Sequence, residues 1–180
     1  MKQLIILIVF TCCFEVNVSA QFKVGVFDLD IMVQVLPEYR HSVDSLLQVY
    51  TDDSLAQEFE FYQQEYKKID STFKIDSVLK KSKSILDFKN SQRQQIALTI
   101  INFEKIAEVK INRKRALLSK PLYEKVFAAY KKVQSESKFN LILKPNSYEL
   151  LSNVENVFVF VAKELRIKLP QELIDLGKMH

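Results

Sequence analysis

The chain has 180 residues, a formal net charge of +4 at pH 7, two cysteines and two glycines. Both cysteines lie in an N-terminal run that we expect to be removed, which excludes disulfides, Cys-based zinc sites and thiol chemistry from the mature protein. Two glycines are too few for a phosphate-binding loop, so we expect no nucleotide hydrolysis and no cofactor.

The first 20 residues have the pattern of an export signal. A positive start, Met1-Lys2, precedes an apolar run at 4–14, and small residues (Val-Ser-Ala) follow at 18–20, where a signal peptidase cuts. The apolar run is too short to cross a bilayer, which takes roughly 20 residues. We therefore expect cleavage after Ala20 and a periplasmic location. The alternative is a retained membrane anchor.

The start of the mature chain, 21–37, is predicted to form the first part of a body. Alternating, β-rich residues at 22–27 predict a strand. Asp28 or Asp30 can cap a short apolar helix at 31–36. Pro37 disfavours helical geometry in the residue before it and suits the first turn of the next helix.

Residues 38–120, between Pro37 and Pro121, contain no Gly and no Pro. As one straight helix they would span about 125 Å, so we expect them to fold back on themselves as an arm. The four-three spacing of a coiled-coil seam is present in the first half and fades near 71–86, where we place the tip of the arm. The seam residues are Leu55, Phe59, Tyr62, Tyr66, Ile69 and Phe73.

The charge of the predicted arm changes sign along its length. Residues 38–71 carry eight acidic and three basic side chains (net −5), whereas 72–93 and 94–120 each carry six basic and two acidic ones (net +4). Two complementary antiparallel helices would have this distribution. Ordinary solvated helix faces are the alternative, because each exposed ion pair contributes only about 0–1 kcal/mol.

Residues 121–166 are predicted to complete the body. A helix continues to about residue 137, a strand follows at 139–143, a turn at 144–147 and a short strand at 148–151. Asn153 can cap a final helix from Val154 to about Arg166. The tail, 167–180, has no clear pattern and is expected to be loose.

The predicted fold class is therefore α+β and mostly helical, with a small β-sheet body and a long antiparallel two-helix coiled-coil arm. A body of roughly 75 residues with two or three strands buries little apolar surface on its own. Oligomerisation would supply the missing core, so we expect an oligomer.

One short motif suggests an enzyme. The strand that ends in Asp28-Leu29-Asp30 resembles the nucleophile loop of haloacid dehalogenase-type phosphatases, where one carboxylate attacks phosphorus beside a magnesium ion. That fold needs alternating strands and helices, which the arm replaces. We interpret both aspartates as capping or turn residues and expect no enzyme. His41 and His180 fit no metal-ligand spacing and are interpreted as surface residues.

Two basic clusters, 113–115 and 80–83, could contact nucleic acid, but export argues against that partner. A solvated face is the default interpretation. The sharper alternative is attraction to an anionic membrane surface or to acidic clients, because one cluster lies at the predicted tip. The basic tip comprises Lys74, Lys80, Lys81, Lys83, Lys89 and Arg93.

Aromatic residues are frequent along the predicted arm. Most of them fit the seam, and packing inside the arm is the simpler role, but exposed aromatics such as the off-seam Phe61 could hold an apolar chain. The candidate client-binding residues are Tyr50, Phe59, Phe61, Tyr62, Tyr66, Phe73, Phe88 and Phe103.

The order of parts resembles the Skp/OmpH family of periplasmic chaperones. The resemblance covers the signal, the first strand and short helix, Leu-Pro-Glu-Tyr at 36–39, the charged hairpin, Pro-Leu-Tyr-Glu-Lys-Val at 121–126, the strand at 141–143 and the closing helix. Members are homotrimers with a small β body and three coiled-coil arms, and they hold unfolded outer-membrane proteins. The resemblance places five residues in the trimer body: Val24, Val26, Leu141, Ile142 and Leu143.

The resemblance implies an ATP-independent holdase whose weak, multivalent contacts keep unfolded outer-membrane proteins from aggregating. Pro37 and Pro121 would be hinges where the arms splay around clients of different size. No lipopolysaccharide site is carried over, because the Gly-free tip and the modest net charge depart from the family pattern. The alternative is a non-catalytic structural or adhesion coiled coil, which would not suppress aggregation.

Overall fold

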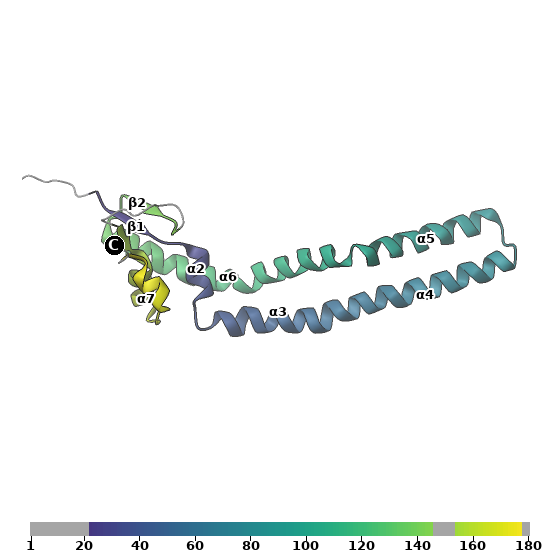
Figure 1. Ribbon diagram of the computed structural model, residues 1–180, viewed down its shortest axis with the longest axis horizontal. Helices are drawn as coiled ribbons and strands as arrows, with labels where there is room; N and C mark the ends of the chain where they lie inside the picture. The colour runs from purple at the N-terminus through teal and green to yellow at the C-terminus, as the bar shows by residue number, and fades with distance from the viewer. Residues whose placement is uncertain (1–21, 146–153, 178–180) are drawn as a thin grey trace, which may run out of the picture.

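The computed structural model describes residues 22–145 and 154–177, so the predicted signal, the strand expected at 148–151 and His180 lie outside the described residues. The protein is mostly helical, with a three-stranded parallel sheet. A body holding the sheet lies at one end of the molecule, and a long helical arm extends from it (Figure 1).

The sheet has its first strand in the middle. Strand β1 (Val24–Val26) pairs in parallel with β2 (Leu141–Leu143) on one side and with β3 (Val154–Asn156) on the other. Residues 154–156 were expected to begin the last helix, and that expectation is wrong. The free edge of β1 offers them ladder hydrogen bonds, and the helix cap shifts to Asn156, whose Oδ1 accepts from the N–H of Phe158 at 3.1 Å.

Gly25, in the middle of β1, lies where two neighbouring side chains approach the backbone. A Cβ added there would lie 2.5 Å from Val157 Cγ2 and 2.8 Å from Ile142 Cδ1. Both distances are shorter than any normal carbon–carbon contact, so the sheet and helix α7 (Val157–Leu165) can approach this closely only over glycine.

Gly25→Ala is therefore expected to destabilise the protein by about 1–3 kcal/mol through overpacking. Urea unfolding followed by circular dichroism measures this loss. A matched control is Ser91→Ala, an equally small change at an exposed position on the arm. Equal stability of the Gly25 variant and the wild type would contradict the close packing.

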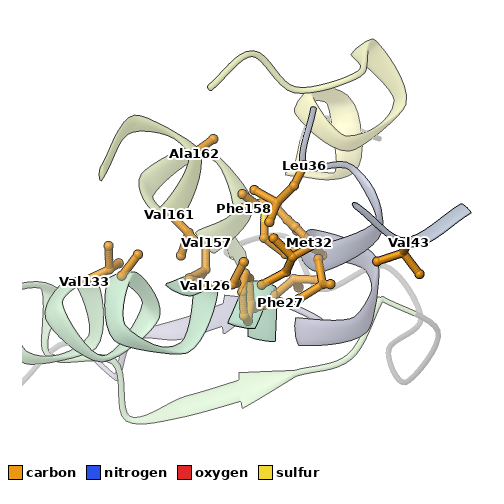
Figure 2. Packing of buried hydrophobic residues seen from close by; sticks show 14 of the residues in the cluster. Phe27, Met32, Leu36, Val43, Val126, Val133, Val157, Phe158, Val161 and Ala162 are labelled. Atoms are coloured by element: carbon orange, nitrogen blue, oxygen red, sulfur yellow. The ribbon is translucent and has the colours of Figure 1, made fainter. Parts of the chain in front are cut away.

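The hydrophobic core lies where three helices meet the sheet. Helix α2 (Leu29–Gln34), α7 and the body end of α6 (Phe103–Ser137) pack around Phe27, whose ring stacks on Tyr130 at 4.8 Å and lies 5.0 Å from Phe158. Figure 2 shows Met32, Phe158 and Val126 converging at this point. A single chain thus forms a continuous core in the body.

The tail contains more structure than expected. Helix α8 (Gln171–Ile174) and the 3₁₀ turn η3 (Asp175–Gly177) follow α7, and Leu173 packs against the core. The Nδ2 group of Asn156 donates to the carbonyl of Leu173 at 2.5 Å. The expectation of a loose tail is wrong for 167–177, because a contact from the sheet edge orders it.

The arm consists of two rods of helix that lie side by side and are joined at the far end (Figure 1). The outgoing rod contains η1 (Arg40–Asp44), α3 (Ser45–Val49), η2 (Tyr50–Leu55) and α4 (Ala56–Val78), of which η1 and η2 are π-helical. The returning rod contains α5 (Lys83–Ile101) and α6.

The returning rod is interrupted at Asn102 rather than at Pro121. Asn102 leaves helical geometry (φ −97°, ψ 9°), and its Nδ2 donates to the carbonyl of Leu98 at 2.8 Å. Helix α6 continues through Pro121. An Asn side chain competes for backbone carbonyls and so favours the end of a helix.

The tip is shorter than the predicted 71–86, since only residues 79–82 are non-helical. Within the helical part of that range, Ser71, Thr72 and Ser77 donate their hydroxyls to carbonyls four residues back at 2.7–2.8 Å. Lys80 takes the left-handed conformation (φ 52°) that glycine usually fills, and the N–H of Lys81 bonds to the carbonyl of Asp76. This is a Schellman turn built without glycine.

Candidate functional site

The two aspartates after β1 have structural partners. Asp28 caps α2: its Oδ1 accepts from the N–H of Asp30 at 2.8 Å and of Ile31 at 3.2 Å, and its Oδ2 pairs with Lys144 at 3.1 Å. Burial would raise the pKa of the Asp28 carboxyl, but these hydrogen bonds, led by Lys144, together hold that pKa below its usual range. The predicted capping role of Asp28 is confirmed.

Two polar contacts lie where the arm leaves the body, close to both predicted hinge prolines. The hydroxyl of Tyr123 donates to Asp30 at 2.6 Å, and Lys125 pairs with Glu38. The hydrogen bond to the Asp30 carboxylate raises the pKa of Tyr123 to about 12, so this hydroxyl keeps its proton even at a pH where an ordinary tyrosine ionises. The Tyr123–Asp30 hydrogen bond lies within the body, and only the Lys125–Glu38 pair joins the body to the first residue of the arm.

Residues 22–145 and 154–177 contain no group of three or more His, Cys, Asp or Glu side chains that could hold a metal ion. His41 lies exposed on η1, as expected of a surface residue. None of the described helices is long and apolar enough to span a membrane.

Ion pairs join the two rods of the arm. Lys110 Nζ lies 2.5 Å from Glu58, Arg93 lies 3.0 Å from Asp70, and Lys89 lies 2.9 Å from Asp76. The hydrogen bond to Glu58 raises the pKa of Lys110. In each pair the acid is on the outgoing rod and the base on the returning rod, as the charge distribution of the sequence suggested.

The predicted client-binding aromatics fall into two groups. Six lie at least partly covered on the arm. Phe103 is buried, and its ring centroid lies 4.9 Å from that of Phe59 and 6.2 Å from that of Tyr62. The ring of Phe73 lies under Arg93, the ring of Tyr50 lies under Lys114, and Tyr66 is half-buried. Only Phe61 (57 % exposed) and Phe88 (64 %) are largely open to solvent.

Two hollows on the arm were not predicted from the sequence. One, of 340 Å³, is lined by Gln63, Tyr66, Lys67, Ala97, Ile100 and Ile101. The other, of 450 Å³, extends toward the body and is lined by Thr51, Leu55, Ala56, Phe59, Ile100, Ile101, Phe103, Glu104, Ala107 and Ile111.

Because both hollows include Ile100 and Ile101, they form one shallow apolar groove between the rods, which we call the arm groove. Ile101 is 75 % exposed beside it. The sequence signal that could have predicted this groove is the pair of adjacent isoleucines at the end of α5. Two neighbouring apolar residues cannot both face a coiled-coil seam, so one of them must lie outside it.

The residues predicted for the trimer body differ in how accessible they are. Val26 is buried in the core of its own chain, whereas Leu141, on the edge strand β2, is 43 % exposed. Val24, Ile142 and Leu143 are half-buried. Of these five residues, Leu141 offers the most apolar surface to a neighbouring copy.

The six residues of the predicted basic tip differ in whether they form ion pairs. Lys74 and Arg93 pair with Asp70, and Lys89 pairs with Asp76. Lys80, Lys81 and Lys83 lie at or next to the turn and form no ion pair with any described residue.

No family model matches the chain, and a search of curated proteins finds no match. The likeness to the Skp/OmpH family therefore rests on the quoted motifs and on the succession of elements.

Proposed function

We propose that this protein is an ATP-independent periplasmic holdase that binds unfolded outer-membrane proteins and prevents their aggregation. In this proposal the two rods form an antiparallel coiled-coil arm, and three arms of a homotrimer enclose the client. The observation that carries the proposal is the arm groove: a line of apolar surface, open to water, on an arm that charged side chains keep soluble.

The shape of the groove suits a client without fixed structure. It is shallow, so each contact with an apolar side chain is weak and reversible. Several such arms around one chain would raise the effective concentration of binding surface, which gives useful affinity without any nucleotide-driven release step. Ion pairs such as Glu58–Lys110 hold the rods together while the groove stays free.

The edge strand β2 is the natural contact between copies. Among the described residues its backbone is paired only with β1, and Leu141 is exposed on it. Exposed edges of this kind pair readily with another strand. Val26 has no part in this contact, because it is already buried within one chain.

The test dilutes an unfolded outer-membrane protein from urea and measures its aggregation by light scattering, with and without this protein. A separate measurement of the mass of this protein in solution tests for a trimer. The variant Ile101→Ser removes a side chain that lines both hollows of the groove and is 75 % exposed. We expect it to need roughly tenfold more protein for the same suppression, since it loses apolar contact area.

The matched control is Val109→Ser, which removes a similarly exposed apolar residue of the arm that does not line the groove. It is expected to behave like the wild type. A wild-type protein that suppresses no aggregation would contradict the proposal and favour the structural or adhesion coiled coil.

A further inference from the structure

The covered residues of the outgoing rod are regularly spaced except at one step. Leu47 and Leu55 are buried, and Tyr50 is half-buried under Lys114, whereas residues 51–54 are all exposed. A coiled-coil seam advances by three or four residues at a time, but Tyr50 and Leu55 are five residues apart. The outgoing rod therefore carries one residue more at this point than a regular seam needs.

The π turn η2 spans the same interval, Tyr50–Leu55, and takes up the extra residue. In a continuous α-helix, Leu55 would follow Leu47 by eight steps of about 100° and would point about 80° away from the seam. A π turn closes its hydrogen bonds over five residues instead of four, so it contains one residue more. Leu55 thereby returns to the inner face of the rod, where it is 3 % exposed.

The returning rod has no matching insertion. Its covered residues opposite η2 follow steps of four, three and four, and they are Ala107, Ile111, Lys114 and Leu118. A turn inserted into only one of two packed rods changes the outline of that rod, so that the side chains of the two no longer interlock there. The larger hollow of the arm groove lies at this level, and its residues from η2 and the next position are Thr51, Leu55 and Ala56.

We propose that the extra residue of the outgoing rod holds the arm groove open, which makes the π turn η2 a positioning element of the binding surface. Thr51 supports the turn, because its hydroxyl donates to the carbonyl of Leu47 at 2.9 Å. A groove that is open before a ligand arrives needs no rearrangement on binding. The use of this groove by clients rests on the proposed function, whereas its opening does not.

Small side chains are the competing cause of the hollow. Ala56, Ala97 and Ala107 line the groove. The distance between two packed helices depends on the side chains at their contact, so alanines by themselves would let the rods move closer together and close the space. The π turn accounts both for the open groove and for the five-residue step in the sequence.

Deletion of Asp53 tests the proposal, because it converts the five-residue step into a regular step of four. Asp53 is exposed and does not line the groove. The variant is expected to fold, with amides of α4 exchanging no faster than in the wild type. Deletion of Gln64, an exposed residue of α4, interrupts a regular seam instead and is expected to accelerate this exchange about 100-fold.

Binding of Nile red, a neutral apolar dye, measures the opening of the groove without a client. Deletion of Asp53 is expected to weaken dye binding about tenfold, since the rods then cover the apolar lining. Asp53→Asn removes the same charge but keeps the number of residues, and it is expected to bind the dye like the wild type. Ile101→Ser is expected to weaken binding and Val109→Ser to leave it unchanged, which locates the dye in the groove.

Three results would overturn the proposal. Equal loosening of α4 by the two deletions would show that the outgoing rod has no surplus residue at η2. Unchanged dye binding after deletion of Asp53 from a folded arm would assign the opening to the alanines. Wild-type protein that binds no dye, or dye binding that Ile101→Ser leaves unchanged, would show that the groove takes no apolar ligand. The aggregation assay decides the holdase proposal separately, because a protein that binds the dye without suppressing aggregation contradicts only that proposal.

Discussion

Phe158→Ala is expected to lower the free energy of unfolding by about 3–5 kcal/mol, the largest effect of any single substitution considered for this protein. Phe158 has no exposed surface and lies at the centre of the core, 5.0 Å from the ring of Phe27 (Figure 2). Its loss leaves a cavity between α2, α6 and α7, which cannot close because the sheet and three helices hold its walls.

The measurement is urea unfolding followed by far-ultraviolet circular dichroism. Phe160→Ala is the matched control, because it removes the same side chain from the same helix at a position that is 37 % exposed. We expect it to cost less than about 1.5 kcal/mol, since it vacates little buried volume. Similar losses in both variants would mean that α7 does not pack as described.

Phe103→Ala is expected to loosen the arm while the body stays folded, with a local cost of about 3 kcal/mol. Within residues 48–118, all of which the structure describes, only Leu55 and Phe103 are buried. Phe103 contacts Phe59 and Tyr62 across the arm, directly after the break at Asn102. This cluster is therefore the main apolar contact that holds the rods together between the root and the tip.

Hydrogen exchange separates the arm from the body. Amides of α4 and α5 are expected to exchange about 100-fold faster in Phe103→Ala, whereas amides of β1 and α7 keep their protection. Phe88→Ala removes the same side chain from the same rod where it is 64 % exposed, and it is expected to change neither. Equal acceleration in the body would show that the arm and the body unfold as one unit.

The candidate site could be predicted only in part. The four-three spacing identified Leu55 and Phe59 as inner residues, and the acidic and basic segments anticipated pairs such as Glu58–Lys110. The same spacing assigned most aromatics to the seam, and three of them, Phe59, Tyr66 and Phe103, also line the arm groove. The exposed Ile101 was missed, because a seam pattern describes what two helices bury between them and not what they leave open.

Local signals in the sequence decided where helices form and which of their faces are apolar. Uninterrupted helical propensity between Pro37 and Pro121 and the Asp28 cap required no knowledge of the rest of the chain, since these effects act over a turn or two of helix.

Only the tertiary structure decided the features that depend on residues far apart in the chain. These are the strand at Val154–Asn156, the ordered segment after 167 and the arm groove. The local preference of a residue for helix or strand is worth only about 1 kcal/mol. Contacts with a sheet edge, a distant carbonyl or the second rod readily exceed it.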